Sequence, residues 1–214
     1  MDLRLSGEQQ QIVDAFAALY AREANPDAVR AAEPLGHDPN LWQSLAGIGA
    51  VSMAVDEQAG GEGASLLDLA LVAEQHGRAI APAPLVDAQV AARVLARVGA
   101  DAALARVMEA GELIVFAPRP AVDGQLRVVP AGAVATQVVA RSGSAIVLVP
   151  GGGAHVENLG ALPLADLRVD GDATVLADGE AAALAWDAAL DDWLLLTAAS
   201  VVGIAARSRE LGVA

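Results

Sequence analysis

The chain has 214 residues, enough for one large domain or two small ones, and its formal net charge is −14. Its 13 basic residues are all arginines and form no basic stripe, which argues against nucleic acids and anionic membrane surfaces as partners. Cysteine is absent, so disulfides and thiol catalysis are excluded. The first residues lack a basic stretch followed by an apolar run, so we predict no secretory signal and expect a cytoplasmic protein.

The first half of the chain is predicted to be helical, with a core of small and aliphatic side chains. Hydrophobic residues make up 55% of the chain but aromatic residues only 3%, so the helices must pack closely. Capping residues and helix-starting prolines mark four helix starts, at Ser6, Asn25-Pro26, Asp38-Pro39 and Ser65. Two more helices are expected at Asp87 to Val98 and at Asp101 to Ala110, closed by Gly99 and Gly111.

Between these helices, Val51 to Val55 is expected to be extended. The segment Gly60-Gly61-Glu62-Gly63 follows it. This segment lacks the Lys-Ser/Thr pair of a phosphate-binding loop, so we interpret it as a turn that needs positive φ angles.

The hydrophobic period changes after Gly111, where seven short β-prone runs follow within about seventy residues. They are Leu113–Phe116, Leu126–Val129, Val134–Ala140, Ala145–Val149, Val156–Leu159, Leu167–Val169 and Thr174–Leu176. This pattern predicts a small antiparallel sheet or barrel. The order of helices, then strands, then helix favours an α+β fold with segregated layers over alternating βαβ units.

The last segment is predicted to be a helix that begins after Glu180 and is continuous from Asp187 to Ala214. A seam with alternating steps of four and three residues is expected at Leu190, Leu194, Thr197, Val201, Ile204, Ser208 and Leu211. The run from Trp193 to Ala206 is uncharged and apolar on nearly every side, so we expect another domain or a second chain to cover it. It is shorter than the roughly 18–20 apolar residues of a membrane span, so we expect no membrane insertion.

No catalytic or metal-binding constellation stands out among the polar residues. His37, His76 and His155 are far apart and are interpreted as surface or capping residues. Most carboxylates are expected at helix starts, as at Asp38, Asp68, Asp101 and Asp187. Gly151-Gly152-Gly153 is interpreted as a flexible turn, and Glu74 as a weak functional candidate on an apolar helix.

Three stretches of the sequence resemble the acyl-CoA dehydrogenase family. They are the helix start Leu5–Gln10, the run from Leu41 to Arg78 with its glycine turn, and the final run from Thr197 to Ala214. The resemblance implies an N-terminal all-α helical domain (residues 1–111), a small antiparallel β-barrel middle domain (112–180) and the first helix of a C-terminal four-helix bundle (181–214). It also implies FAD between the middle domain and the bundle, and a Glu that takes the α-proton of an acyl-CoA while the β-hydride passes to the flavin.

The sequence departs from the family where the flavin would be bound. A usual Thr-Glu-Pro string is replaced by Pro118-Arg119-Pro120, the Ala-Gly-Ser-Asp string is missing, and a Trp-Ile-Thr string reduces to Val134-Ala135-Thr136. The resemblance leaves Phe116, Ala117 and Thr136 as candidate flavin contacts. It assigns no catalytic residue within the chain, because the family places the base beyond this segment.

Three functional hypotheses remain open. The first is a degenerate partner subunit of a heteromeric flavoenzyme that binds acyl-CoA and associates through the helix Asp187–Ala214. The second is a diverged but competent homo-oligomeric acyl-CoA dehydrogenase with FAD. The third is a non-enzymatic module that docks a partner through the same helix.

Overall fold

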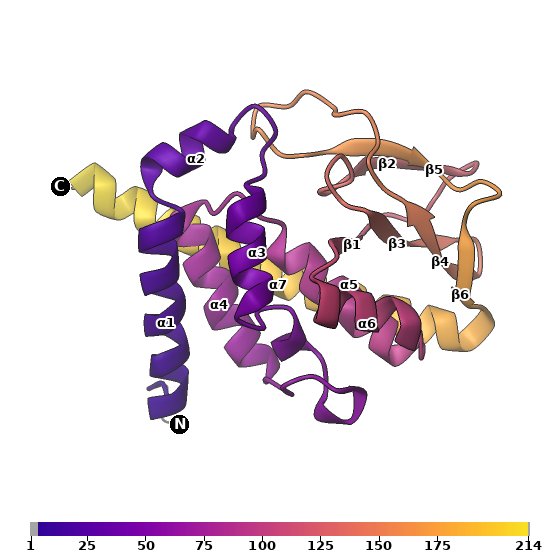
Figure 1. The fold of residues 1–214 in the computed structure, drawn as a ribbon, viewed down its shortest axis with the longest axis horizontal. Coiled ribbons are helices and arrows are strands. Elements are labelled where there is room, and N and C mark those ends of the chain that lie inside the picture. Colours follow the sequence, from indigo (N-terminus) through magenta and orange to yellow (C-terminus); the bar gives the residue numbers. More distant parts are fainter. Residues whose placement is uncertain (1–3, 214) are drawn as a thin grey trace.

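The computed structural model describes residues 4–213 and has the predicted order of helices, strands and a final helix (Figure 1). The helical part comprises α1 (Gly7–Glu23), α2 (Pro26–Ala32), α3 (Pro39–Gly47), α4 (Leu66–Ala79), α5 (Leu85–Arg97) and α6 (Asp101–Ala110). The β part comprises β1 (Ile114–Phe116), β2 (Gln125–Val129), β3 (Gln137–Ser142), β4 (Ala145–Pro150), β5 (Ala165–Arg168) and β6 (Thr174–Ala177). The long helix α7 (Gly179–Val213) follows.

The four predicted helix starts are confirmed by their caps. Ser6 and Gln9 form a reciprocal capping box, in which the Gln9 N–H donates to Ser6 Oγ over 3.1 Å. Ser65 and Asp68 form a second box at the start of α4. The side chains of Asn25 and Asp38 accept backbone N–H groups at the starts of α2 and α3, where Pro26 and Pro39 hold the first helical positions.

The segment before the glycine turn differs from the prediction. Residues Ser52–Ala54 form a 3₁₀ turn, not an extended strand, because no neighbouring strand offers hydrogen bonds and the chain turns back on itself locally. The glycine turn itself is confirmed, with φ angles of 87° at Gly60 and 65° at Gly63. A Cβ on Gly61 would lie 2.1 Å from the Val55 carbonyl oxygen, so this position also needs glycine.

The strands form a four-stranded sheet in the order β1-β3-β4-β6 and a two-stranded sheet of β2 and β5. The strand pairs are antiparallel except β1–β3, which is parallel because the chain crosses over through β2 between these two strands. The predicted run Val156–Leu159 is not a strand. Its neighbour His155 makes only an isolated bridge to Ala165, and the loop 158–162 folds on the side chain of Asn158 instead.

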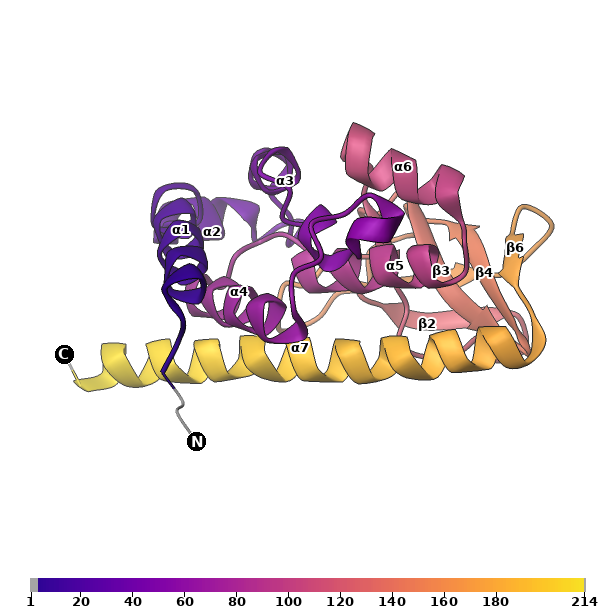
Figure 2. The same ribbon diagram turned by 90° about the horizontal axis from the view of Figure 1, so that it is seen from below.

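Helix α7 runs as one straight rod beneath α4, α5 and the sheet, and no other element of residues 4–213 lies on its far side (Figure 2). It packs mainly along α4 and α5. The side chains buried in this contact include Ala182, Ala185, Trp186, Ala189, Asp192, Leu196 and Gly203. The helix begins at Gly179, so Asp187 lies inside it and the prediction of Asp187 at a helix start is wrong.

Most of the larger residues of the predicted seam of α7, which the sequence predicts to be covered by another domain or a second chain, are exposed in the described part of this chain. Leu194, Val201, Ile204 and Leu211 are 52%, 56%, 40% and 64% exposed. The buried stripe combines several alanines with Trp186 and Leu196, and at Gly203 the helices approach so closely that a Cβ would clash with the backbone of α4. The outward face of α7 therefore remains apolar and uncovered by the rest of the described chain.

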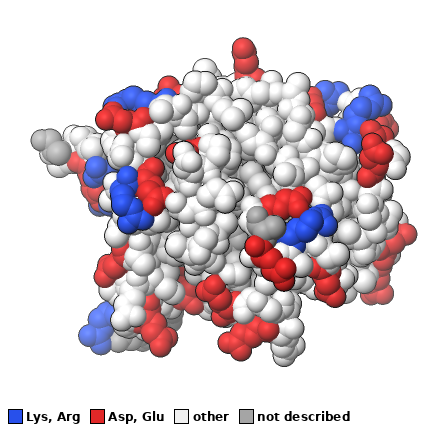
Figure 3. All heavy atoms as spheres, viewed as in Figure 1, with Lys and Arg blue, Asp and Glu red and all other residues white. Residues whose placement is uncertain are grey.

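By length and composition alone, α7 is able to cross a membrane, and 22% of its most apolar window is buried. Core helices of soluble proteins meet the same criterion. The helices and sheets share one continuous core, in which Leu45, Leu69, Leu95, Phe116 and Ile146 are almost fully buried. On the face seen in Figure 3, basic side chains occur in small groups beside acidic ones.

Candidate ligand-binding site

A cleft of about 550 Å³ lies where the helical part, the loops of the β part and α7 meet. This volume is within the range of roughly 300–1,000 Å³ that is usual for small-molecule sites. Its walls come from α2, the end of α4, the start of α5, the loop after β2, the loop before β5 and the middle of α7. The lining is mostly apolar and includes Val29, Ile80, Pro82, Leu85, Val86, Pro130, Leu159, Leu162, Leu164, Trp193 and Ile204.

His76, near the end of α4, is one of the few polar groups in the wall of the cleft. Its Nδ1 lies 3.1 Å from the Tyr20 hydroxyl oxygen, and it also bonds the backbone of Ala83. Burial lowers the pKa of His76 to about 4, so the ring is neutral at pH 7. A neutral ring that donates a hydrogen bond to the Ala83 carbonyl accepts one from the Tyr20 hydroxyl group at its other nitrogen. His76 thus joins α1, α4 and the loop before α5, and the prediction of a surface or capping residue is wrong here.

Asp87 in the first turn of α5 contacts the middle of α7. The Trp193 Nε1–H donates to Asp87 Oδ1 over 2.8 Å. Burial raises the pKa of Asp87 to about 6, and the hydrogen bond from Trp193 limits this rise. Both residues line the cleft, so its floor carries a carboxyl group tied to an indole.

A second contact between α5 and α7 joins Asp192, the residue before Trp193, to two arginines further along α5. Asp192 Oδ2 is 2.9 Å from Arg93 Nε and 2.6 Å from Arg97 Nη2, and the Asp192 side chain is only 8% exposed. Arg93 also donates to the Ala54 carbonyl oxygen over 3.0 Å. Because both arginines are engaged here, this cluster fixes α7 against α5.

The predicted flavin contacts Phe116 and Ala117 lie at the end of β1. Phe116 is fully buried, with its ring centroid 4.8 Å from that of Trp186 on α7. The Ala117 N–H donates to the Val139 carbonyl oxygen over 2.9 Å, and Ala117 lines a cavity of about 110 Å³. The other lining residues are Pro118, Arg119, Arg127, Val128, Val129, Pro130 and Trp193. Ala117 therefore forms part of the wall of this cavity, whereas Phe116 lies in the core against Trp186.

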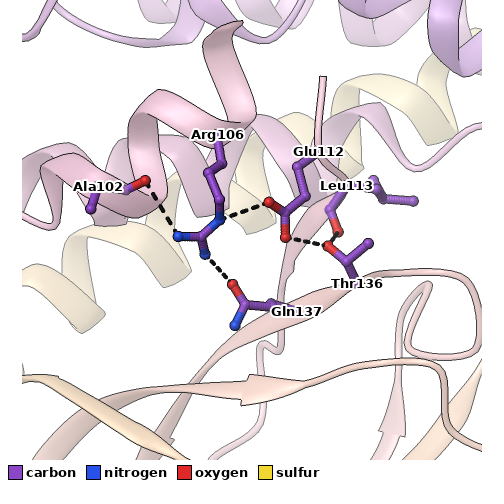
Figure 4. Close-up of polar contacts among 6 residues, drawn as sticks. All are labelled: Ala102, Arg106, Glu112, Leu113, Thr136 and Gln137. Carbon is purple, nitrogen blue, oxygen red and sulfur yellow. Dashed lines mark hydrogen bonds and ion pairs between the residues drawn. The ribbon is translucent and has the colours of Figure 1, made fainter. Parts of the chain in front are cut away.

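The third predicted contact, Thr136, lies beside Glu112 and Leu113 (Figure 4). Its Oγ1 is 2.8 Å from Glu112 Oε1 and 2.9 Å from the Leu113 carbonyl oxygen. Arg106 donates to the other oxygen of Glu112 over 2.7 Å and also bonds Gln137. Thr136 thus belongs to a polar cluster that joins α6 to the start of β3, and it lines neither cavity. Its role as a flavin contact stays a prediction.

The small cavity at Ala117 is not large enough by itself to enclose FAD. A volume of about 110 Å³ is well below the roughly 300 Å³ at which cofactor pockets begin. Pro118 offers neither a hydroxyl nor a backbone N–H to a flavin ring. Arg127 is already paired with Asp166 over 2.8 Å.

The other candidate motifs have structural roles. A Cβ on Gly151 would lie 2.2 Å from the Ala135 carbonyl oxygen, and Gly152 has a φ of 72°, as a turn requires. The backbone of Glu74 lies against Gly203 of α7. Within residues 4–213, no group of three His, Asp or Glu side chains is placed to hold a metal ion.

Comparisons with known proteins agree with this architecture. The family model for the acyl-CoA dehydrogenase N-terminal domain matches residues 6–110. Acyl-CoA dehydrogenase IpdE2 of Mycolicibacterium smegmatis is 36% identical over 127 residues, which are 57% of this chain and 41% of the relative. The chain thus spans less than half the length of this curated relative.

Solved structures establish the fold. A variant of the Tcur3481-Tcur3483 steroid ACAD has a TM-score of 0.79 and 24% identity, over 95% of this chain and 65% of that one. The ChsE4-ChsE5 complex from Mycobacterium tuberculosis has a TM-score of 0.73 and 20% identity, over 86% and 61%. The chain shares with these structures its order of a helical part, a small β part and a long helix. With the family match and the curated relatives, the chain belongs to the acyl-CoA dehydrogenase family.

Sequence reasoning missed the pairing of Asp87 with Trp193. The two residues are 106 positions apart, and each has an ordinary local explanation. Asp87 is an acidic residue in the first turn of a helix, and Trp193 is one of several large apolar residues in α7. Trp193 opens the uncharged run of α7, and its indole N–H needs a hydrogen-bond acceptor when it is buried, but the sequence does not indicate which residue supplies that acceptor.

Proposed function

We propose that this chain is a degenerate subunit of a heteromeric acyl-CoA dehydrogenase, which binds an acyl group in its cleft and leaves the flavin chemistry to a partner subunit. The observation that carries the proposal is the small volume of the cavity at Ala117, where Pro118 offers neither a hydroxyl nor a backbone N–H to a flavin. Each hydrogen bond lost from a buried cofactor group costs about 1–3 kcal/mol, or up to about two orders of magnitude in affinity. The loss of several such bonds prevents ordinary FAD binding by this chain's own residues.

The uncovered face of α7 supports association with other polypeptide. Full burial of a large aliphatic side chain contributes roughly 1.5–3 kcal/mol, and this face carries several of them. Leu194, Leu195, Val201 and Val202 are all at least 40% exposed. The ChsE4-ChsE5 complex, which shares the fold, has two different components. We propose that the helix ending in Ala214 (itself outside the described residues) associates in the same way, with a homologous chain of the same or a different sequence.

The test is the distribution of flavin between separated subunits. The gene is expressed alone and together with acyl-CoA dehydrogenase-like genes from the same genome, and each purified species is examined for flavin absorbance and for oxidation of acyl-CoAs. We expect this protein alone to be colourless and inactive, and the complex to be yellow and active. A yellow protein that oxidises acyl-CoA without any partner contradicts the proposal.

A second candidate is a competent homo-oligomeric acyl-CoA dehydrogenase that binds FAD. The cleft favours it, because about 550 Å³ of mostly apolar space at the junction of the layers is suited to an acyl group. The same experiment separates the two candidates, since a homo-oligomer would retain flavin when expressed alone.

A further inference from the structure

We propose that Trp193, positioned by Asp87, is the wall that limits the depth of the cleft and separates it from the cavity at Ala117. The inference deepens the proposed function, because it concerns how far an acyl group can extend into that site. A linear saturated acyl chain is the class of ligand that such a wall would measure.

The geometry of the two cavities carries the proposal. The cavity of about 110 Å³ and the cleft of about 550 Å³ share two lining residues, Pro130 and Trp193. Pro130 belongs to the loop that leaves β2, and its ring is much smaller than the indole of Trp193. We therefore assign most of the partition to the indole, which comes from α7.

The indole is held in place from its polar edge. The Trp193 Nε1–H donates to Asp87 Oδ1 over 2.8 Å, and Asp87 is fixed in the first turn of α5. The adjacent bonds from Arg93 and Arg97 to Asp192 hold α7 against α5 in the same register. The ion pairs of Asp192 therefore fix the helix that carries Trp193, and the hydrogen bond to Asp87 fixes the orientation of its ring.

Removal of the indole should join the two spaces. A Trp193→Ala variant would connect the cleft to the cavity beside Ala117 and Pro118, both apolar in their side chains. Each further methylene that becomes buried raises affinity by about fourfold. A chain that stops at the wall in the unaltered protein would therefore continue past it in the variant.

The experiment measures dissociation constants by calorimetry for saturated acyl-CoAs from butyryl- to palmitoyl-CoA, with the protein in the complex in which it is isolated. We expect affinity to rise with chain length and level off in the unaltered protein, and to level off at a longer chain in Trp193→Ala. Leu184→Ala, an exposed residue near the start of the same helix that lines neither cavity, is the matched control and should not move the limit.

The role of Asp87 is tested by a pair of substitutions. Asp87→Asn keeps an oxygen that accepts the indole N–H and should preserve the limit. Asp87→Ala has no acceptor for the indole N–H and adds no bulk, so the indole is released and the limit should shift toward longer chains. A simple structural role for Asp87 would not give this difference between the two variants.

An unchanged chain-length limit in Trp193→Ala overturns the inference. If no acyl-CoA binds to any variant, the proposed function fails instead, and a crystal structure of Trp193→Ala then decides the inference. One continuous cavity supports the partition, and two cavities separated by other side chains refute it.

Discussion

Gly77 of α4 and Gly203 of α7 mark the closest approach of the two helices. A Cβ on Gly77 would lie 1.9 Å from the Ser200 carbonyl oxygen, and one on Gly203 would lie 2.0 Å from the Glu74 carbonyl oxygen. Each glycine therefore faces the backbone of the other helix. This contact sets the height of α7 beneath the cleft, because Trp193, Thr197 and Ser200 lie on the same stretch of the helix.

We expect Gly77→Ala and Gly203→Ala each to lower the free energy of unfolding by about 1–3 kcal/mol, because the helices must separate to admit the methyl group. In an uncrowded helix the same change would stabilise by roughly 0.5–1 kcal/mol. Urea denaturation followed by circular dichroism measures the effect. Gly212→Ala is the control, since nothing lies within 4 Å of the new Cβ. Equal effects at Gly203 and Gly212 would contradict the close contact.

Asp192 is expected to be the most sensitive charged residue of α7. Asp192→Ala leaves two largely buried guanidinium groups without a counter-charge, which costs about 3 kcal/mol of stability. Asp191→Ala, on the exposed side of the same turn, should change stability by less than about 0.5 kcal/mol. Thermal and chemical denaturation of the two variants side by side provides the measurement. A mild effect at Asp192 would show that the arginines find water or other partners.

Asp87 should make stability fall as the pH rises from about 4 to about 6. Its pKa is raised from 3.8 to about 6 in the folded chain, so the folded state holds a proton that the unfolded state has released. Asp87→Asn abolishes this loss. The variant should match the unaltered protein in pH dependence below pH 4 and gain on it up to pH 6, by at most about 3 kcal/mol. Denaturant titrations across this pH range measure the difference, and a constant difference would refute the shift.

His76 should act in the opposite direction. Its pKa is lowered from 6.5 to about 4, so the unfolded state takes up a proton first and stability is lost as the pH falls through this range. His76→Gln removes the titration and weakens the bonds to Tyr20 and Ala83. We expect the variant to be less stable at pH 7, with the gap narrowing by up to about 3 kcal/mol as the pH falls to 4.

The contributions of Asp87 and His76 to the pH dependence of the unfolding free energy nearly cancel between pH 4 and pH 6 in the unaltered protein. Only the variants therefore reveal them. A gap between His76→Gln and the unaltered protein that stays constant with pH would show that His76 is solvated. Asp87→Asn serves as the internal comparison, because its difference has the opposite sign.

Much of the fold was predictable from local sequence. The caps at Ser6, Asn25, Asp38 and Ser65 fix the helix starts through hydrogen bonds between residues at most three positions apart. Six of the seven predicted apolar runs coincide with the strands β1 to β6, since alternation and turns are also local properties. The family resemblance extended this to the order of the layers.

The sequence could not determine which face of α7 packs against α4, or what the cleft contains. Helical periodicity is the same for both faces of an all-apolar helix, so the choice depended on the glycines that allow the two backbones to meet. The sequence also did not place Thr136 with Glu112, or Asp87 with Trp193, because these contacts join segments distant in the chain. Local hydrogen bonds and periodicity therefore set the elements, whereas close packing between distant elements decided the site.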